Sequence, residues 1–366
     1  MKNTKILFLN LYTFGLTGGI EKVCRSLAKA LTDLSARFQL YAMHDRNTDL
    51  DKRYLDTHQY KGFNGQKIYF SLAAVLKGIN SNIVILSHIN LLAFGWLIKK
   101  ISPRTKIILY AHGIEIWEKL PNWKRKFLQE KVEVWAVSEY TAAKITTIHQ
   151  LNRKKISILH NCLDPYFSIP NQFERSALLL QHYHLQHDQP ILFTLSRLSA
   201  KEAYKGYDQI LAAMPSLLKK YPDLHYLLAG KADEQEELRV KNLIEQFDLK
   251  THVTLCGFIE DEELSEYFKL GSVFVMPSTH EGFGIVFIEA AACGAKIIGG
   301  NADGSVDALL HGQLGTLVNP QSVEEIGMAI DKNLTSVHHP SAIQRTCIAN
   351  FGYSEYPSKI GRLILA

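Results

Sequence analysis

Cysteine is scarce in this sequence, and long uninterrupted apolar runs are missing. The five cysteines among 366 residues are scattered, and no two of them form a Cys-x-x-Cys pair. We therefore expect neither a disulfide framework nor a zinc site, and a cytoplasmic location in a reducing cytosol. The most membrane-like stretch, residues 82–98, carries Ser87, His88 and Asn90 near its middle. A strand followed by a helix fits this stretch better than a membrane span.

The start of the sequence does not have the pattern expected of a secretory leader, and the composition is not that of a disordered chain. The apolar run near the start is interrupted by Asn10, Tyr12 and Thr13, and no small-x-small cleavage site follows it. We expect a first β-strand from Lys5 to Leu11 instead. With 46% hydrophobic and 21% charged residues, the chain has the composition of a globular protein, and its length suits two domains.

Acidic residues are few in the first half of the chain. Residues 1–160 contain 25 Lys or Arg against 11 Asp or Glu, a formal charge of +14, and the remaining residues carry −9. The net charge of +5 therefore hides a strong asymmetry. This asymmetry points to a partner or surface that the first half contacts.

The first half has the pattern of alternating strands and helices. The strand at Lys5–Leu11 leads into a loop with Gly15, Gly18 and Gly19, and an amphipathic helix follows from Ile20 to Leu34. Strand, glycine loop and helix open a Rossmann-like domain, although the glycine spacing is not that of a dinucleotide site. Further strands are expected at residues 38–43, 83–86, 106–110, 134–137 and 156–159.

Strand and helix patterns restart in the second half. Residues 165–189 contain two prolines and mixed polar residues, and we expect them to cross to a second domain. The alternation beyond them predicts another doubly wound α/β unit. Strands are expected at residues 191–195, 225–229, 253–256 and 273–276, and helices at residues 207–221, 234–247, 262–270 and 285–293.

The stretch from Ser278 to Gly294 carries the strongest functional signal. A buried strand pattern ends at Pro277, and Gly282 and Gly284 then bracket Phe283 ahead of a buried helix. The first turn of that helix leaves backbone N–H groups unpaired, and the small residues before it let a ligand come close. Such a helix N-terminus suits a phosphate group.

Two carboxylates flank this turn. Glu281 stands just before it, and Glu289 lies on the helix, roughly 7.5 Å beyond Gly284 along the axis. This is about the reach from one end of a diphosphate to the sugar beyond it, so the two carboxylates could bind groups on either side of the phosphates. The alternative is two ordinary charges on a solvated helix face. The apolar neighbours argue against it, since an unpaired buried carboxylate is costly.

The order Glu281-Gly-Phe-Gly, Glu289-Ala, Cys293-Gly294 resembles the E-x7-E element of retaining glycosyltransferases of family 4. The similarity covers most of the chain and is densest from residue 197 to residue 320. The resemblance implies an α/β GT-B fold, in which two Rossmann-like, doubly wound domains face a central cleft. It places an acceptor-side domain at residues 1–165 and a nucleotide-sugar-binding domain at residues 185–345, with a last helix at residues 350–366 packed back on the first domain.

The resemblance also implies roles for charged residues. Glu281 would lie by the donor hexose, and Glu289 would bind the nucleotide ribose. Arg197 and Lys205 resemble the family's cationic pair on the donor diphosphate. Lys201 is a rival to Lys205, because the gap between the two cations is longer than in many relatives.

Other positions resemble parts of the same site. His112 follows a strand and would lie near the donor sugar, although a core histidine is the alternative, and Ser138 ends the next strand. The remaining candidates are glycine-rich or apolar: Gly18 and Gly19 in a loop facing the diphosphate, Gly257, Phe258 and Ile259 in the loop that contacts the base, and Gly282, Phe283 and Gly284 at the helix turn.

A D-x-D tripeptide, Asp49-Leu50-Asp51, lies after the second expected strand. In metal-dependent transferases such a pair holds a divalent cation, but there it follows a buried strand. The surroundings here are polar, so we expect a surface loop, no metal site and no cofactor. Arg197 and Lys205 would then supply the positive charge that a leaving diphosphate needs.

The sequence therefore predicts a retaining, metal-independent glycosyltransferase. It would move a hexose from a UDP- or GDP-linked sugar to a glycan or lipid-linked acceptor, as in cell-surface polysaccharide assembly. His112, Glu281, Arg197 and Lys205 would act on the reacting groups. The alternatives are a nucleotide-sugar epimerase of the same fold and a non-catalytic nucleotide-sugar-binding protein, and no nucleic acid partner is indicated.

Basic residues of the first half gather in two clusters. One runs from Lys99 to Lys106, and the other from Lys119 to Lys126 beside Trp117 and Trp123. Lysine and arginine are attracted to anionic bilayers, and tryptophan favours the membrane interface. We expect peripheral contact with the inner face of the cytoplasmic membrane. The alternative is a solvated basic surface.

Overall fold

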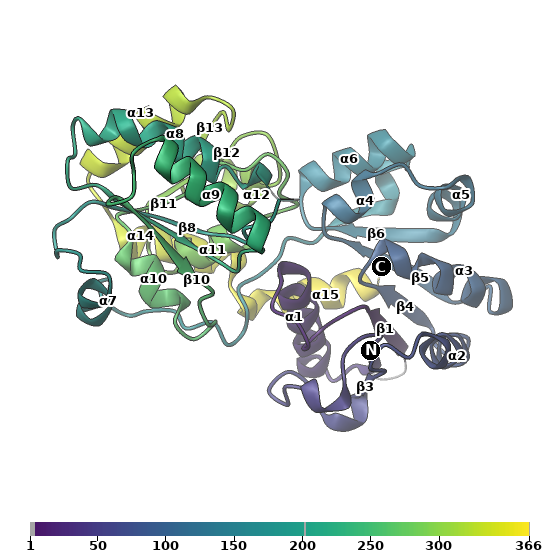
Figure 1. Cartoon of the computed structure of the whole chain (residues 1–366). Coiled ribbons are helices and arrows are strands. Elements are labelled where there is room, and N and C mark those ends of the chain that lie inside the picture. Colours follow the sequence, from purple (N-terminus) through teal and green to yellow (C-terminus); the bar gives the residue numbers. More distant parts are fainter. Residues whose placement is uncertain (1–3, 201–202, 366) are drawn as a thin grey trace. The chain divides into compact units, whose positions relative to one another are not determined.

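The computed structural model describes residues 4–200 and 203–365, and the chain forms two compact units, each built on a parallel sheet (Figure 1). The first unit comprises Met1–Pro165 and Phe351–Ala366, and the second comprises Tyr166–Asn350. Both sheets are covered by helices, which is why their strands are nearly continuous apolar runs. The predicted α/β class with two Rossmann-like units is confirmed.

The sheet of the first unit has seven strands in the order β3-β2-β1-β4-β5-β6-β7. Each neighbouring pair is parallel. The order reverses between β1 and β4, which makes their carboxyl ends the usual place for a ligand. The strands are β1 (Lys5–Asn10), β2 (Arg37–Ala42), β3 (Tyr60–Gly62), β4 (Ile83–Leu86), β5 (Lys106–Ala111), β6 (Val132–Ala136) and β7 (Ile156–Ile158).

Helices of the first unit pack on this sheet. The buried residues of α2, α3, α5 and α6 join one core with alternate residues of the strands, such as Leu7 and Leu9. The last helix, α15, packs against α1, and the hydroxyls of Tyr110 and Tyr356 are hydrogen-bonded at 3.0 Å. The helices are α1 (Gly19–Asp33), α2 (Lys67–Gly78), α3 (Leu92–Ile101), α4 (Ile114–Trp117), α5 (Asn122–Lys131), α6 (Glu139–His149) and α15 (Tyr356–Leu365).

The second unit has a six-stranded sheet in the order β10-β9-β8-β11-β12-β13, which reverses between β8 and β11. The strands are β8 (Ile191–Leu195), β9 (His225–Ala229), β10 (Val253–Gly257), β11 (Val273–Met276), β12 (Ile297–Gly300) and β13 (Thr316–Val318). The helices are α7 (Ala177–His182), α8 (Tyr207–Leu218), α9 (Glu234–Gln246), α10 (Leu264–Leu270), α11 (Ile285–Ala292), α12 (Ser305–Ala308), α13 (Val323–Thr335) and α14 (Pro340–Phe351).

Several helices lie where the sequence analysis named none, and α2 and α7 are among them. Helix α7 falls within the stretch expected to cross between domains. That stretch is tied to the second unit, because Arg175 donates hydrogen bonds to the carbonyl of Gln189 at 2.8 Å and to Ser272 Oγ at 2.6 Å. Residues 82–98 form β4 and the first part of α3, as expected. Within the described ranges, no helix is both long and apolar enough to cross a membrane.

Candidate functional site

The loops after β8 and β11 lie at the reversal point of the second sheet. The loop after β8 carries Arg197 and Lys205, and the loop after β11 carries Glu281. Because the carboxyl ends of adjacent parallel strands share one edge, these loops are neighbours at the place where such sheets bind ligands.

The structure brings Lys205 and Glu281 into direct contact. Lys205 Nζ forms an ion pair with Glu281 Oε1, and each side chain is only 14% exposed. The two loops approach closely beside this pair. The Thr279 N–H donates a hydrogen bond to the carbonyl of Tyr204 at 3.0 Å, and the space at Gly206 has no room for a side chain, since a Cβ there would lie 2.4 Å from the Pro277 carbonyl oxygen. The rival Lys201 lies outside the described residues.

Asp303, which the sequence analysis did not single out, holds the Glu281 loop. It lies in the loop after β12 and is 1% exposed. Its carboxylate accepts hydrogen bonds from Ser278 Oγ at 2.8 Å, from the Glu281 N–H at 2.7 Å and from the Ser305 N–H at 2.9 Å. Burial and the nearby Glu281 raise the pKa of Asp303 to about 6. An aspartate in a glycine-bracketed loop after a buried strand is the signal that could have identified it.

The turn before α11 needs glycine for steric reasons. Gly284 is the N-cap of α11 with φ of 86°, and no side chain caps the helix. A Cβ at Gly304 would lie 2.2 Å from the carbonyl oxygen of Gly282, so the loops after β11 and β12 approach closely. On the turn and on α11, Phe283 and Glu289 are 2% and 3% exposed. Glu289 is therefore not a charge on a solvated helix face.

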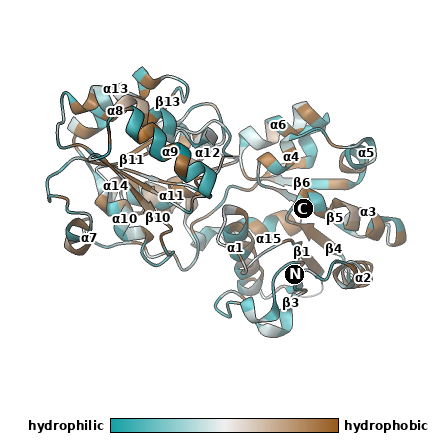
Figure 2. Cartoon of the chain, viewed as in Figure 1, coloured by the Kyte–Doolittle hydropathy of each residue, from teal (hydrophilic) through white to brown (hydrophobic). Residues whose placement is uncertain are grey.

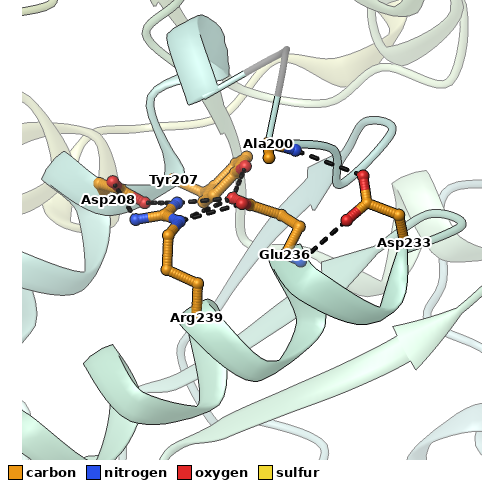
Figure 3. Close-up of polar contacts among 6 residues, drawn as sticks. All are labelled: Ala200, Tyr207, Asp208, Asp233, Glu236 and Arg239. Carbon is orange, nitrogen blue, oxygen red and sulfur yellow. Dashed lines mark hydrogen bonds and ion pairs between the residues drawn. The ribbon is translucent and has the colours of Figure 1, made fainter.

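Helix α9 anchors the β8 loop through its N-cap (Figure 3). Asp233 accepts hydrogen bonds from the Glu236 N–H at 2.8 Å and from the Ala200 N–H at 3.3 Å. Leu198, next to Arg197, forms an isolated β-bridge with Ala232. This anchoring holds the backbone next to Arg197 at the sheet edge, and Arg197 itself is exposed.

The same helix carries a dense polar network (Figure 3). Arg239 makes two bonds of 2.8 Å to Asp208 on α8 and contacts Glu236 at 2.6 Å. The hydroxyl of Tyr207 donates a hydrogen bond to the same Glu236, which is fully buried. Arg239 is the largest cause of the lowered pKa of Glu236. The network joins α9 to the first turn of α8, directly after Lys205.

The predicted base-contact loop is divided between surface and core. Gly257 ends β10 with φ of 71°, and Phe258 after it is 49% exposed. Ile259 is 4% exposed. The Phe258 side chain is therefore accessible at the surface, whereas Ile259 packs inside.

Gly18 and Gly19 begin α1 in the first unit. Gly18 is the N-cap, and a Cβ on it would lie 2.3 Å from the Glu21 carboxylate. The preceding loop is fixed by Asp45, which accepts hydrogen bonds from the Thr13 N–H at 2.9 Å and from the Phe14 N–H at 2.8 Å. The glycine loop is thus built at the reversal point of the first sheet.

His112 follows β5, and its ring is close to that of Tyr110, with centroids 4.6 Å apart. Both ring nitrogens are shielded from solvent, and neither has a hydrogen-bond partner of good geometry among residues 4–200 and 203–365. Burial and the neighbouring His88 lower the pKa of His112 to about 3, so the imidazole is neutral at physiological pH. The Ser87 backbone interacts with the ring and raises its pKa, but less strongly than burial lowers it. Buried ring nitrogens without a well-aligned hydrogen bond are unusual in a core.

Two further polar residues of the first unit belong to the same edge. The side chain of Glu115 accepts a hydrogen bond of 2.6 Å from the His112 N–H, and burial raises the pKa of its carboxyl. Ser138 is the N-cap of α6 and accepts from the Thr141 N–H at 2.9 Å. Ser138 therefore has a structural use that the sequence analysis did not consider.

The two aspartates of the D-x-D tripeptide have separate partners. Asp49 bonds to the Arg46 side chain at 3.2 Å, and Asp51 pairs with Arg53 at 2.6 Å. Each carboxylate thus serves its own local turn.

Two doubly wound parallel units, with glycine-rich turns at their reversal points, define the GT-B architecture. Residues 17–167 match the family described as Glycosyltransferase Family 4, and residues 179–346 match Glycosyl transferases group 1. Together the two matches extend over most of the chain. The chain belongs to the group 1, family 4 glycosyltransferases.

Known proteins resemble the chain at low identity. It is 26% identical over 207 residues to an uncharacterized glycosyltransferase of Methanocaldococcus jannaschii, covering 56% of this chain and 52% of the relative. It is 28% identical over 249 residues to the GDP-mannose-dependent alpha-(1-6)-phosphatidylinositol monomannoside mannosyltransferase of Mycolicibacterium smegmatis, covering 65% and 63%. The chain thus spans between half and two thirds of the length of these curated relatives.

A solved structure shows the same fold over nearly the whole chain. Anabaena HepE in complex with UDP and glucose superimposes with a TM-score of 0.81 and 20% identity, over 99% of each chain. At this identity the likeness is one of fold.

Proposed function

We propose that the chain is a retaining, metal-independent glycosyltransferase that moves a hexose from a nucleotide-diphosphate sugar to an acceptor hydroxyl. The observation that carries this proposal is the Lys205–Glu281 pair beside the uncapped N-terminus of α11, with the buried Glu289 further along that helix. A GDP-mannose-dependent relative and a neighbour bound to UDP support a UDP- or GDP-linked donor.

In this proposal the diphosphate lies at the positive end of α11. Arg197, Lys205 and the N–H groups near Gly284 stabilise its charge as the bond to the sugar breaks. Lys205 exchanges its Glu281 partner for a phosphate oxygen when the donor binds. Glu281 is then available to the hexose hydroxyls, while Glu289 binds the ribose and Phe258 stacks on the base.

The first unit would serve the acceptor and the donor sugar. A neutral imidazole can donate one hydrogen bond and accept another, so His112 is assigned to positioning sugar hydroxyls and not to carrying charge. Neither it nor Glu281 is given a covalent role. Gly18 and Gly19 would approach the diphosphate.

The acceptor would be a lipid-linked or polysaccharide precursor. The +14 charge of residues 1–160 supports contact with an anionic membrane surface. The name of the mycobacterial relative, which acts on a phosphatidylinositol mannoside, supports a lipid-linked acceptor. The protein would then work peripherally at the inner face of the membrane.

A screen of nucleotide sugars by thermal stabilisation tests the donor class. A bound donor raises the unfolding temperature with the logarithm of ligand excess, so the preferred base and sugar should stand out. Donor conversion then separates the alternatives. A transferase slowly hydrolyses its donor without acceptor, an epimerase returns an altered sugar, and a binding protein leaves the donor intact.

The division of labour between the two glutamates gives a sharper test. Glu289→Gln should weaken binding of the nucleoside diphosphate about ten- to a hundredfold, because a charge-assisted hydrogen bond is lost. Glu281→Gln should lower turnover but leave that binding equal or tighter, since Lys205 is released. Calorimetry measures both variants, and equal losses of affinity would contradict the assignment.

A further inference from the structure

The outer side of α2 is apolar although it faces solvent. Ile68 is 80% exposed, Leu72 61% and Leu76 63%, and their spacing of four places them in one stripe along the helix. The opposite side of α2 buries Phe70 and Ala74 in the core of the first unit. A helix that is apolar on both sides is normally buried, so the exposed apolar side of α2 is unusual for a surface helix.

This apolar surface continues onto neighbouring helices. Helix α2 packs against α3, and α3 against α5. All three helices bury residues in the same core, so their outer sides form one layer. In Figure 2 the brown colour of α2 marks it as hydrophobic. We define the apolar face as the seven exposed residues Ile68, Tyr69, Leu72, Leu76, Leu97, Ile101 and Trp123.

Cations border the apolar face, and acids are few. Residues 61–131 contain 12 Lys or Arg against 3 Asp or Glu, and α2 and α3 contain no acidic residue. Lys100 Nζ lies 4.0 Å from the ring centroid of Trp96, which packs on Trp123 at 5.8 Å between centroids. A hollow beside the end of α3 is lined by two glutamates and by the cations Lys99, Arg104, Lys106, Lys131, Lys154 and Lys155.

We propose that the apolar face inserts into the interfacial region of an anionic phospholipid bilayer, with the bordering cations on the headgroups. This inference rests on the membrane contact proposed above, but it does not depend on the transfer reaction. Contiguous exposed apolar surface marks an interaction site. Helices that lie in the interface bury one apolar side and place cations and tryptophans at headgroup level. A bilayer supplies both the apolar layer and the negative charge.

Vesicle binding of the full chain, without any sugar donor, tests the inference. Vesicles of phosphatidylcholine alone are compared with vesicles that also contain phosphatidylglycerol, and sedimentation gives the bound fraction. The variant Ile68→Ser/Leu72→Ser/Leu76→Ser should bind the anionic vesicles at least about tenfold more weakly than the unmodified chain. Because these side chains are exposed, its thermal midpoint should be unchanged.

Two comparison variants make the result specific. Leu178→Ser/Leu238→Ser removes leucines that are 79% and 62% exposed in the second unit, and it should bind like the unmodified chain. Lys124→Glu/Arg125→Glu/Lys126→Glu tests the electrostatic contact alone. If this charge variant loses binding while the apolar variant keeps it, the membrane contact stands and the insertion is wrong.

The remaining outcomes also overturn the inference. An unmodified chain that binds no vesicle has no inserting face. If it then sediments as a dimer that the apolar variant dissociates, the apolar face is a contact between copies of this chain.

Discussion

At the level of single residues, the carboxylates of the second unit are held in different ways. Glu281 shares an ion pair with Lys205, whereas Asp303 accepts three hydrogen bonds in a buried loop. One of those donors is the Glu281 N–H. Asp303 therefore sets the backbone from which Glu281 reaches its partner, and it acts as a positioning residue.

The raised pKa of Asp303 predicts a specific pH dependence of stability. A carboxyl whose folded pKa of about 6 exceeds its unfolded value stabilises the fold at low pH, and this stabilisation is lost as pH rises through 6. When the pH is lowered from 7 to 5, the free energy of unfolding of the unmodified protein should rise by about 1 kcal/mol relative to that of Asp303→Asn. Denaturant unfolding at both pH values measures the difference. A change of opposite sign would mean that the fold holds Asp303 ionised.

His112 gives a prediction about turnover. His112→Ala should lower turnover about tenfold or more while leaving the thermal midpoint nearly unchanged, because the ring nitrogens make no well-aligned hydrogen bond within the described residues. Because the pKa of His112 is lowered to about 3, the pH dependence of turnover in the unmodified enzyme should show no step from this residue near pH 6.5. Insolubility of the variant would favour a core histidine, and full activity would remove His112 from the site.

At the level of elements, the polar network of α9 fixes the start of α8. Arg239 satisfies two carboxylates, one of which belongs to the fully buried Glu236. Removing the cation would leave a buried carboxylate without its strongest partner, which is a costly state. The network therefore stabilises the segment that begins at Lys205.

Arg239→Met should lower the free energy of unfolding of the second unit by about 2 kcal/mol. This is less than the cost of breaking a fully buried ion pair, because the Arg239 side chain is 38% exposed. Lys241→Met is the matched control on the same helix, since Lys241 pairs with Glu237 at the surface, and its effect should stay within about 0.5 kcal/mol. Because Arg239 lowers the pKa of Glu236, the difference should shrink as pH falls through that lowered pKa. If both variants change the free energy of unfolding equally, the Arg239 network contributes no more to stability than a surface ion pair.

Sequence patterns predicted the elements better than the contacts between them. Buried strands such as β11 and the glycine turn before α11 follow from apolar runs and steric need, so both were expected where they occur. The outer stripe of α2 was not, because its apolar residues continue around the helix and lack the polar face that marks a surface helix. Asp303 was also missed, since it depends on a loop that only the sheet order brings beside Glu281.

At the scale of the whole molecule, the charge difference between the halves accords with separate tasks. The basic half has the apolar face and His112, and the acidic half has the Lys205–Glu281 pair. Arg197 and Lys205 are thus local positive charges in a half of the chain whose net charge is negative. We assign them the role that a divalent ion has in other transferases.

Metal independence is therefore expected for the intact enzyme. Activity should survive excess EDTA, because Arg197, Lys205 and the α11 terminus supply positive charge to the diphosphate. Loss of activity on chelation, followed by recovery with Mn²⁺ or Mg²⁺, would contradict this assignment and return attention to Asp49 and Asp51.

The most direct measurement follows donor hydrolysis by proton NMR, using the nucleotide sugar that stabilises the full chain most. We expect slow release of nucleoside diphosphate and of a hexose that first appears in the anomeric configuration it had in the donor. Lys205→Ala and Glu281→Gln should both suppress this release. A hexose that first appears in the opposite configuration, or release that neither variant changes, would contradict a retaining reaction at this site.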